Sequence, residues 1–392
     1  MEDNQITQAK KIGILAGIYP PDIGGPAVYS ARLAEELTIR DKEVTVICYS
    51  EKGFQRIEKV FDWSFKVVGI SRKLGFLRFL SYLYHTLRLV RGSDILYAQT
   101  LFSAGIPGLI AGKIFRKKAA VKITGDHAWE RFNKGETVEE FQNKKYGWRV
   151  QLVKKMQIFL LKRFSKIIVP SQYLKKIISS WGVPPQKIVV IYNAPDSLPD
   201  LVISQKEAQE KIGVEGDVIL SVGRLMSWKG FDSLIEIIPE LLKENPNFHL
   251  VIVGEGPERQ NLELRIKNSG LEEKVKLVGK VSHDKMYLYF GAADLFVLNT
   301  GYEGLSHVIL EAMQAGLPII TTNIGGNPEL IEDGQNGILI DPGNKEQLKS
   351  AILRLSKDKA LQEKFRQNSK EILKAFTWQN VIDETLEVLN SL

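Results

Sequence analysis

The stretch Glu303-Gly304-Leu305-Ser306-His307-Val308-Ile309-Leu310-Glu311 decides the fold of the second half of the chain. It directly follows the apolar run Leu295-Phe296-Val297-Leu298, which is typical of a buried strand. Apolar residues then recur at helical spacing, namely at Leu305, Val308, Ile309, Ala312 and Met313. The pattern predicts a strand that runs directly into a helix.

The start of this helix is predicted to bind an anion. The amides of Gly304, Leu305 and Ser306 would lie in its first turn, where free N–H groups and the positive end of the dipole suit a phosphate. Eight steps of about 100° bring Glu311 to within about 80° of Glu303, roughly 12 Å along the helix axis. Both carboxylates are therefore expected to face one cleft, which suits a long, hydroxylated ligand.

The bulk composition indicates two domains and no membrane span. A chain of 392 residues exceeds the usual size of one core, and 44% of its residues are apolar. The first ten residues are polar, and we find no apolar stretch of about 18 residues, so we expect a cytoplasmic protein. The single cysteine, Cys48, excludes disulfides within the chain and any cysteine-rich metal site.

The net charge of +7 is unevenly distributed along the chain. Residues 1–193 contain 32 Lys and Arg against 16 Asp and Glu, a charge of +16, and the remainder contains 21 against 30, a charge of −9. The basic half could attract nucleic acid, anionic lipid or phosphorylated substrates. It carries no recognisable nucleic-acid motif, so we expect no nucleic-acid partner.

Strands and helices alternate along the whole chain, which predicts an α/β fold with two doubly wound, Rossmann-like domains facing a central cleft. Between the two series of strands, residues 192–200 turn to Pro, Asp and Asn, as expected of a linker. We expect domains at 1–193 and 194–375, and a final helix over 376–392 that follows the last strand of the second domain and is free to pack elsewhere. The expected strands are Lys11–Gly17, Val44–Tyr49, Phe65–Ile70, Ile95–Gln99, Ala119–Thr124, Lys166–Val169, Ile188–Ile191, Val218–Val222, Leu250–Val253, Val275–Val278, Leu295–Leu298, Pro318–Thr321 and Ile338–Ile340.

Two predicted helices of the first domain combine basic residues with aromatic residues and leucine. They span Arg72 to Arg91 and Lys144 to Lys166. This composition is typical of helices that lie on a membrane surface, and equally of core-packed helices with a solvated basic face. Because two such helices occur in one domain, we favour peripheral attachment to an anionic membrane surface.

A pair of cations follows the strand Val218–Val222, at Arg224 and Lys229 between Gly223 and Gly230. Ligands of open α/β sheets bind at the carboxyl ends of the strands, and an Arg and a Lys there suit a diphosphate. No Asp-x-Asp sequence that would hold a metal-bound diphosphate is present, so we expect a site without a metal. The Gly254-Glu255-Gly256 segment is interpreted as a tight turn beside the cleft.

These segments, in this order and spacing, resemble the donor-binding domain of glycosyltransferase family 4, the retaining transferases of the GT-B fold. The resemblance rests on Gly223-Arg224-Leu225 with Lys229-Gly230, on Val253-Gly254-Glu255-Gly256-Pro257, and on the run from Glu303 to Ile320. The glycine loop ending at Gly25 and the closing Phe376-Thr377-Trp378 segment fit as well. In this family the last helix crosses back to the first domain, so the resemblance implies that the helix over 376–392 does the same.

The resemblance implies roles for individual residues. Arg224 and Lys229 would bind the diphosphate of a nucleotide sugar, Glu311 the ribose, and Glu303 with the backbone after it the sugar and distal phosphate. The loop Gly279 to Val281 would meet the base, and Gly25 would approach the donor from the facing domain. The full set of expected donor-binding residues is Gly24, Gly25, Gly223, Arg224, Lys229, Gly254, Gly279, Val281, Glu303, Gly304, Leu305, Ser306, Val308 and Glu311.

On the acceptor side, the resemblance points to the end of the strand Ala119–Thr124. Many relatives have a His-Asp pair there, whereas this chain has Gly125, then Asp126, then His127. We expect Asp126 to be the polar group of the active site, with His127 as the alternative. The expected catalytic residues are Asp126, His127, Glu303, Arg224 and Lys229.

The sequence therefore predicts a retaining glycosyltransferase, a metal-independent hexosyltransferase with no cofactor, that moves a sugar from a nucleotide diphosphate sugar to an acceptor hydroxyl. A lipid-linked saccharide or another glycan precursor at the inner face of the membrane is the expected acceptor. A sugar-nucleotide 2-epimerase of the same fold and a non-catalytic anion-binding protein are the alternatives.

Overall fold

The structure, a computed structural model, describes residues 11–22, 25–50, 55–56, 64–133, 135–196 and 203–392. The chain divides into two compact units, which are Met1–Asn133 with Glu139–Tyr192 and Gln379–Leu392, and Lys134–Val138 with Asn193–Trp378. The first unit thus contains almost all of the last helix, α16 (Trp378–Asn390). Positions 197–200 of the expected linker lie outside the described residues.

The first unit is built on a sheet of order β3-β4-β2-β1-β5-β6-β7-β8. All its neighbouring strands pair in parallel except the two-residue β3, which is antiparallel to β4. The strands are β1 (Lys11–Leu15), β2 (Glu43–Ser50), β3 (Gln55–Arg56), β4 (Lys66–Ser71), β5 (Ile95–Ala98), β6 (Lys118–Lys122), β7 (Lys166–Val169) and β8 (Ile188–Val190). β3 was not predicted, because two residues carry no periodicity.

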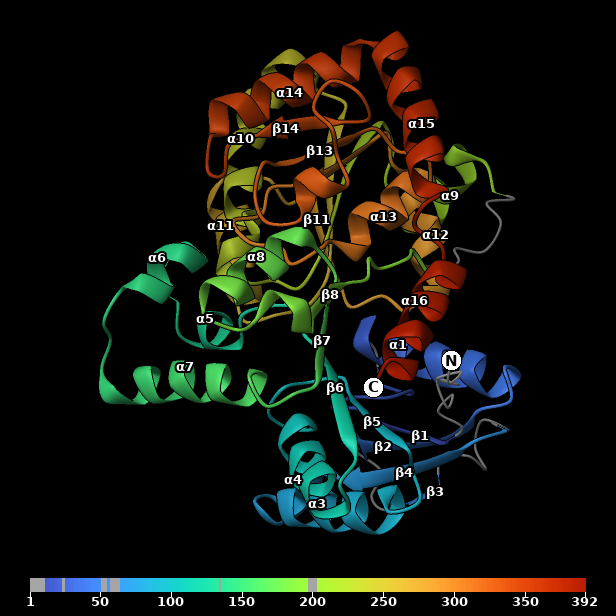
Figure 1. Ribbon diagram of the computed structural model, residues 1–392. Helices are drawn as coiled ribbons and strands as arrows, with labels where there is room; N and C mark the ends of the chain where they lie inside the picture. The colour runs from blue at the N-terminus through green and yellow to red at the C-terminus, as the bar shows by residue number, and fades with distance from the viewer. Residues whose placement is uncertain (1–10, 23–24, 51–54, 57–63, 134, 197–202) are drawn as a thin grey trace. The chain divides into compact units, whose positions relative to one another are not determined.

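Helices cover both faces of this sheet, as expected for a doubly wound fold. Figure 1 shows α3 and α4 on one face and α1 and α16 on the other. The Tyr29 hydroxyl of α1 lies 3.5 Å from the Thr385 hydroxyl of α16, and Arg40 pairs with Asp383 at 3.0 Å. The helices are α1 (Gly25–Ile39), η1 (Arg72–Leu74), α3 (Leu77–Val90), α4 (Gly105–Phe115), α5 (His127–Phe132), α6 (Val138–Asn143), α7 (Trp148–Leu161), α8 (Gln172–Ser180) and η2 (Pro185–Lys187).

The second unit holds a six-stranded sheet of order β11-β10-β9-β12-β13-β14, parallel throughout. The strands are β9 (Asp217–Val222), β10 (Phe248–Val253), β11 (Val275–Gly279), β12 (Leu295–Leu298), β13 (Ile319–Thr322) and β14 (Ile338–Ile340). Its helices are α9 (Gln205–Ile212), η3 (Ser227–Lys229), α10 (Phe231–Glu244), α11 (Arg259–Asn268), α12 (His283–Ala292), α13 (His307–Gln314), η4 (Asn327–Glu329), α14 (Lys345–Lys357) and α15 (Lys359–Leu373).

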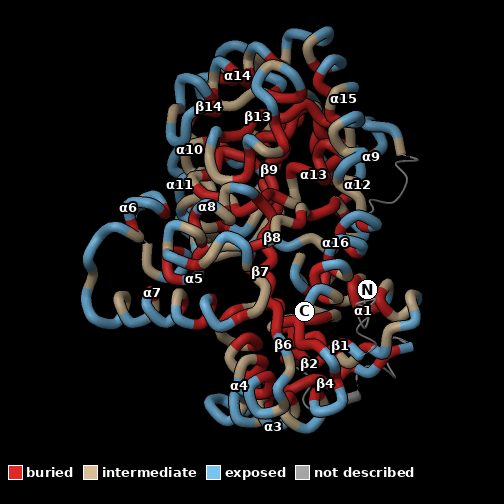
Figure 2. The backbone as a smooth tube through the Cα atoms, in the orientation of Figure 1, coloured by how far each residue is buried: buried red, intermediate tan, exposed pale blue. Residues whose placement is uncertain are grey.

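The strands of each unit form the centre of its hydrophobic core. Figure 2 shows the strands as buried segments, with exposed residues on the outer faces of the helices. In β12 all four residues are buried, as are the four after Lys11 in β1. Strands buried on both faces read as continuous apolar runs, which is why the sequence locates them well. The predicted fold class of two parallel α/β domains is confirmed.

In each sheet the strand order reverses beside the first strand of the unit. β1 lies between β2 and β5, and β9 lies between β10 and β12, so successive connections pass to opposite sides of β1 and of β9. A crevice opens at such a point at the carboxyl ends of the strands, where open α/β sheets bind ligands. The loops after β5, β9 and β12 are therefore the expected ligand-binding segments.

Candidate functional site

The predicted start of the helix after β12 is wrong by three residues. α13 begins at His307, and Ser306 is its N-cap, with its hydroxyl accepting a hydrogen bond from the Ile309 amide at 3.4 Å. Gly304 to Ser306 and Glu303 therefore belong to the loop that precedes the helix. The helical-wheel argument that placed Glu303 and Glu311 on one face fails, because only Glu311 is on the helix.

Glu303 contacts the predicted cation pair directly. Its carboxylate Oε1 forms an ion pair with the Nζ of Lys229, the last residue of η3, and the two side chains are only 13% and 15% exposed. Arg224, at the head of the same loop, is exposed, and within the described part of the chain its side chain makes no hydrogen bond or ion pair. One basic residue of the pair is thus held by Glu303 and the other is available to a ligand.

Close backbone packing holds the loops after β9 and β12 together. The Gly301 amide donates to the Trp228 carbonyl at 2.6 Å, and the Thr300 hydroxyl donates to the same carbonyl at 3.3 Å. Gly230 has φ +65°, and a Cβ there would lie 1.8 Å from the Asn299 carbonyl oxygen. Only glycine fits, so this position fixes the distance between the cation loop and the Glu303 loop.

A second pair of glycines, Gly325 and Gly326 after β13, supports Glu303 from the other side. The Gly326 amide donates to the Glu303 carbonyl at 3.1 Å. Gly325 has φ +61°, and a Cβ there would lie 2.0 Å from that same carbonyl oxygen. The sequence analysis missed this support, although Gly325-Gly326-Asn327-Pro328 after a predicted strand is a turn signal.

Glu311 occupies a different position, on α13, and is only 8% exposed. Within the described residues no hydrogen bond reaches its carboxylate. The Nε2 of His283 lies 3.9 Å from Oε1. Burial, with a further contribution from Asp196, raises the pKa of Glu311 to about 8. The carboxyl group is thus protonated near neutral pH and able both to donate and to accept hydrogen bonds.

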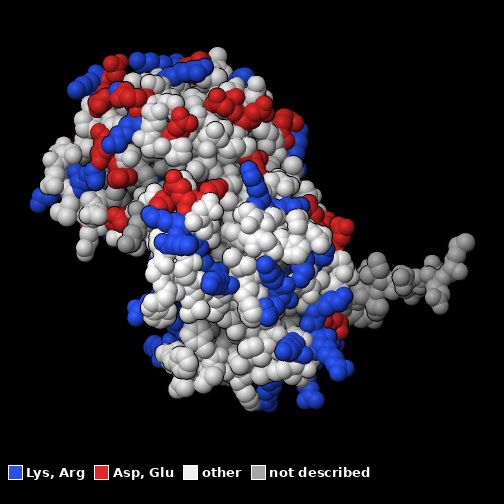
Figure 3. Space-filling view, turned by 60° about the vertical axis from the view of Figure 1, so that its left-hand side comes forward, with Lys and Arg blue, Asp and Glu red and all other residues white. Residues whose placement is uncertain are grey.

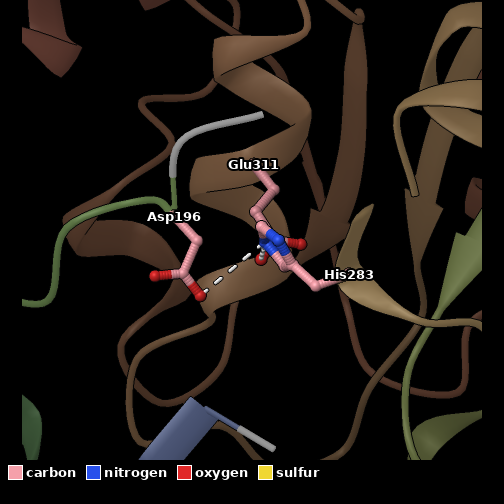
Figure 4. Close-up of side chains that lie close together, drawn as sticks. All are labelled: Asp196, His283 and Glu311. Carbon is pink, nitrogen blue, oxygen red and sulfur yellow. Dashed lines mark ion pairs between the residues drawn. The ribbon is translucent and has the colours of Figure 1, made fainter. Parts of the chain in front are cut away.

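Glu311 is one of three side chains that converge in the second unit. Figure 4 shows Asp196, His283 from the start of α12 and Glu311 pointing toward one another, with His283 Nε2 lying 3.8 Å from Asp196 Oδ2. One ligand atom from each lies within 4.8 Å of the others, so this donor set is able to hold a metal ion. Asp196 and His283 were not predicted, because they lie 115 and 28 residues before Glu311 in the chain.

The remaining expected donor residues lie in loops of the second unit. Gly254 packs closely against the backbone of Gly223, since a Cβ on Gly254 would lie 1.9 Å from the Gly223 carbonyl oxygen. Gly279 ends β11, and Val281 follows it just before α12. Val308 lies in the first turn of α13. Gly25 begins α1 in the first unit, and Gly24 lies outside the described residues.

On the acceptor side, the structure places Asp126 and His127 in different surroundings. Asp126 is fully buried and is the N-cap of α5, and its Oδ1 accepts hydrogen bonds from the amides of Ala128 and Trp129 at 3.0 and 3.2 Å. Gln157 donates to the same oxygen at 3.0 Å, and Gln142 donates to Oδ2. Both carboxylate oxygens of Asp126, the preferred candidate, therefore already accept hydrogen bonds, including those that cap α5.

His127, the first residue of α5, is exposed and lines a cavity in the first unit. Its ring centroid lies 4.6 Å from that of Phe102. Burial, together with the nearby Arg131, lowers the pKa of His127, so the imidazole is neutral at physiological pH. A neutral imidazole both accepts and donates hydrogen bonds, as a hydroxyl acceptor requires.

Most of the exposed large apolar residues in the described chain lie on or beside the two basic helices. Twelve of the fourteen exposed large apolar residues in the described chain lie between Leu74 and Phe159. On η1 and α3 they are Leu74, Phe76, Leu77, Phe79, Leu80 and Tyr84, and on α7 they are Trp148, Leu152, Met156 and Phe159. Figure 3 shows Lys and Arg grouped around uncharged surface on the first unit, whereas the second unit carries both signs.

No helix among the described residues combines the length and the apolar character needed to cross a membrane. The basic helices α3 and α7 have 14 residues each.

Comparison with known proteins identifies the family. The profile described as "Glycosyltransferase Family 4" matches residues 23–197, and the profile "Glycosyl transferases group 1" matches residues 202–372. The chain belongs to glycosyltransferase family 4. Together the two matches cover both units and almost the whole chain.

Individual relatives are more distant. An uncharacterized glycosyltransferase of Methanocaldococcus jannaschii, MJ1607, is 34% identical over 231 residues, 57% of this chain and 59% of the relative. The N-acetylgalactosamine-N,N'-diacetylbacillosaminyl-diphospho-undecaprenol 4-alpha-N-acetylgalactosaminyltransferase of Campylobacter jejuni is 29% identical over 241 residues, 61% of this chain and 64% of the relative. The matched region thus spans less than two thirds of either relative.

Among solved structures, Anabaena Alr3699/HepE in complex with UDP and glucose superposes with a TM-score of 0.79 at 24% identity. The match covers 98% of this chain and 100% of that chain. This likeness shows a common fold of GT-B glycosyltransferases.

Proposed function

We propose that this family 4 protein is a retaining glycosyltransferase that moves a sugar from a nucleotide diphosphate sugar to an acceptor hydroxyl. The observation that carries the proposal is the arrangement at the carboxyl ends of β9 and β12. There the Lys229–Glu303 ion pair, the exposed Arg224 and the start of α13 lie on two neighbouring loops held together through Gly230.

In this proposal the diphosphate binds Arg224 and Lys229. A bound phosphate competes with Glu303 for Lys229, because both are anions that seek the same ammonium group. Once Lys229 turns to the phosphate, the Glu303 carboxylate is free to accept hydrogen bonds from sugar hydroxyls. The departing diphosphate is stabilised by two fixed cations and the amides at the start of α13.

Glu311 binds the ribose. Its carboxyl group lies on α13 beside Asp196 with no hydrogen bond from the described residues, so two neighbouring ribose hydroxyls find unused acceptors there. The loop from Gly279 to Val281, directly before His283, meets the base. Since the diphosphate is neutralised by side chains, we propose that transfer needs no metal ion and no cofactor.

The acceptor is a glycan precursor, and a lipid-linked one fits the exposed apolar residues of α3 and α7. The Campylobacter relative is named for a diphospho-undecaprenol acceptor. We propose that the aromatic and leucine side chains of these helices insert into an anionic membrane surface while their Lys and Arg residues contact lipid headgroups.

The experiment that tests this function follows the fate of the donor. UDP-, GDP- and ADP-sugars are incubated with the protein and EDTA, with and without a lipid-linked or glycan acceptor, and products are assigned by NMR. Transfer with retained anomeric configuration in the presence of EDTA is the expected result. Conversion of the nucleotide sugar into an isomer without any acceptor would identify a 2-epimerase instead.

A further inference from the structure

Three side chains of the second unit form a compact donor set beyond the carboxyl ends of its strands. His283 begins α12, which follows β11, Glu311 lies on α13, which follows β12, and Asp196 lies in the segment that enters the unit. One ligand atom from each residue lies within 4.8 Å of the others. Figure 4 shows the three side chains pointing toward one another. The set therefore offers one imidazole nitrogen and two carboxylate oxygens to a single ligand.

Two members of this set are buried without a hydrogen bond. The Nε2 of His283 is buried and has no hydrogen-bond partner among the described residues. Glu311 is 8% exposed, and His283 Nε2 approaches its Oε1 only to 3.9 Å, which is too long for a hydrogen bond. Leaving such groups unpaired costs roughly 1–3 kcal/mol each, so native proteins retain them chiefly where a ligand or water completes them.

The spacing and the chemistry of the donors suit a divalent transition-metal ion. Zn–N and Zn–O bonds of about 2.0–2.2 Å place two tetrahedral ligands roughly 3.4 Å apart. His283 Nε2 lies 3.8 Å from Asp196 Oδ2 and 3.9 Å from Glu311 Oε1, and the imidazole is partly exposed, so a small rotation closes the difference. An imidazole among the ligands favours zinc and its neighbours over Mg²⁺ or Ca²⁺. Three protein ligands leave the fourth position to water.

We propose that Asp196, His283 and Glu311 bind a divalent transition-metal ion such as Zn²⁺, and that the bound ion competes with the nucleotide sugar. The inhibitory part rests on the proposed function, in which Glu311 accepts the ribose hydroxyls. An ion that coordinates the Glu311 carboxylate, together with its bound water, occupies the position of those hydroxyls. None of the three ligands belongs to the diphosphate site at Arg224 and Lys229, so the ion blocks donor binding and takes no part in transfer.

Metal binding is tested on the full-length chain without nucleotide, by calorimetry with Zn²⁺ and by the visible absorption of Co²⁺, a coloured substitute for zinc. One equivalent of either ion should bind, and His283→Ala should weaken binding by at least about tenfold, since even partners of metal ligands contribute that much. His249→Ala is the matched control, because His249 lies near the start of β10, at the opposite edge of the same sheet. No binding by wild type, or equal affinity in His283→Ala, would overturn the site.

The inhibitory role is tested with whichever of UDP, GDP and ADP binds in EDTA. Zn²⁺ at ten times its Kd should weaken that binding by about tenfold in wild type, as for two ligands that exclude each other. Diphosphates also chelate Zn²⁺ in solution, and His283→Ala under the same conditions should show this effect alone. Equal weakening in both proteins would overturn the inhibitory role. If none of the three nucleotides binds in EDTA, the proposed function fails, whereas the metal titrations test the site independently.

Discussion

Lys229 and Glu303 form an ion pair across the two loops that follow β9 and β12. The pair is mostly buried, and it links the position expected to bind diphosphate to the position expected to bind sugar. Removing one partner of such a pair leaves the other charge without compensation. We therefore propose that the pair is a ligand-sensitive contact at the centre of the donor site.

Lys229→Ala should reduce kcat by about 10² or more, because it removes one preorganised charge from the leaving diphosphate. The thermal unfolding temperature should also fall, because Glu303 is left as a mostly buried carboxylate without its partner, so turnover is measured at a temperature well below unfolding of the variant. Lys345→Ala is the matched control, because Lys345 forms an exposed ion pair with Glu236 in the same unit. Near wild-type turnover by Lys229→Ala would contradict the diphosphate assignment.

Gly325→Ala should weaken donor binding by displacing the Glu303 loop. Its added Cβ meets the Glu303 carbonyl at 2.0 Å. Gly334 also has a positive φ, +69°, but a Cβ there meets nothing within 4 Å. Gly334→Ala is therefore the control, because it introduces backbone strain without a steric clash. Nucleotide affinity measured by calorimetry should fall for Gly325→Ala and stay unchanged for Gly334→Ala; an equal effect in both would show that the loop contact is irrelevant.

Glu311→Gln should stabilise the protein at pH 8 and much less at pH 5. The pKa of Glu311 is about 8 in the folded state and 4.5 in the unfolded one, so the folded protein binds more protons between these values and loses stability as pH rises through that window. Each increase of 1 kcal/mol in the free energy of unfolding raises the unfolding temperature by about 2–4 °C in a unit of this size.

The control for this variant is Glu346→Gln, an exposed surface substitution on α14. The free energy of unfolding is compared between wild type and Glu311→Gln from pH 5 to 8. If the difference between the two proteins did not change with pH, the buried carboxyl would not be protonated as described. The same variant should bind nucleoside diphosphates more weakly, because a neutral amide offers the ribose hydroxyls a poorer acceptor than a carboxyl that can ionise.

The sequence predicts most of the architecture because fully buried strands such as Leu295–Leu298 are continuous apolar runs. It places Arg224, Lys229 and Glu303 on loops of one sheet edge because parallel strands all end at that edge. It fails on the start of α13, since Leu305 satisfies the helical apolar pattern while Ser306 is the residue that caps the helix. Helix boundaries depend on such local hydrogen bonds more than on periodicity.

The convergence of Asp196 and His283 on Glu311 was beyond prediction for a different reason. Asp196 comes from the segment that enters the second unit, and its approach to α13 is a tertiary contact between positions far apart in the sequence. In the same way, the preference for Asp126 over His127 could not take the tertiary contacts of Asp126 into account. Only the positions of Gln142 and Gln157 reveal that Asp126 is already fully engaged.

Asp126→Ala and His127→Ala should therefore affect different properties. Loss of the N-cap of α5, with its bonds to Gln142 and Gln157, should cost about 2 kcal/mol or more and lower the unfolding temperature. His127→Ala should leave the unfolding temperature nearly unchanged and reduce kcat/KM for the acceptor. A folded, stable Asp126→Ala protein with no activity would restore Asp126 as the active-site group.

Trp148→Ser and Phe76→Ser should each weaken cosedimentation with anionic liposomes by about tenfold, since insertion of one aromatic side chain contributes roughly 1.5–3 kcal/mol. The two residues are 72% and 77% exposed on the first unit. Leu264→Ser is the matched control, because Leu264 is 58% exposed on the acidic second unit. Equal recovery of wild type with and without anionic vesicles would contradict the membrane proposal.

The most direct test of the donor site is a thermal-shift titration of wild type and the Arg224→Ala/Lys229→Ala double variant with UDP, GDP and ADP. A ligand that binds only the folded state at 100 times its Kd stabilises it by about 2.7 kcal/mol. We predict that at least one of these nucleotides raises the unfolding temperature of wild type and has no effect on the double variant. No shift with any of the three, or an equal shift in the double variant, would contradict the account.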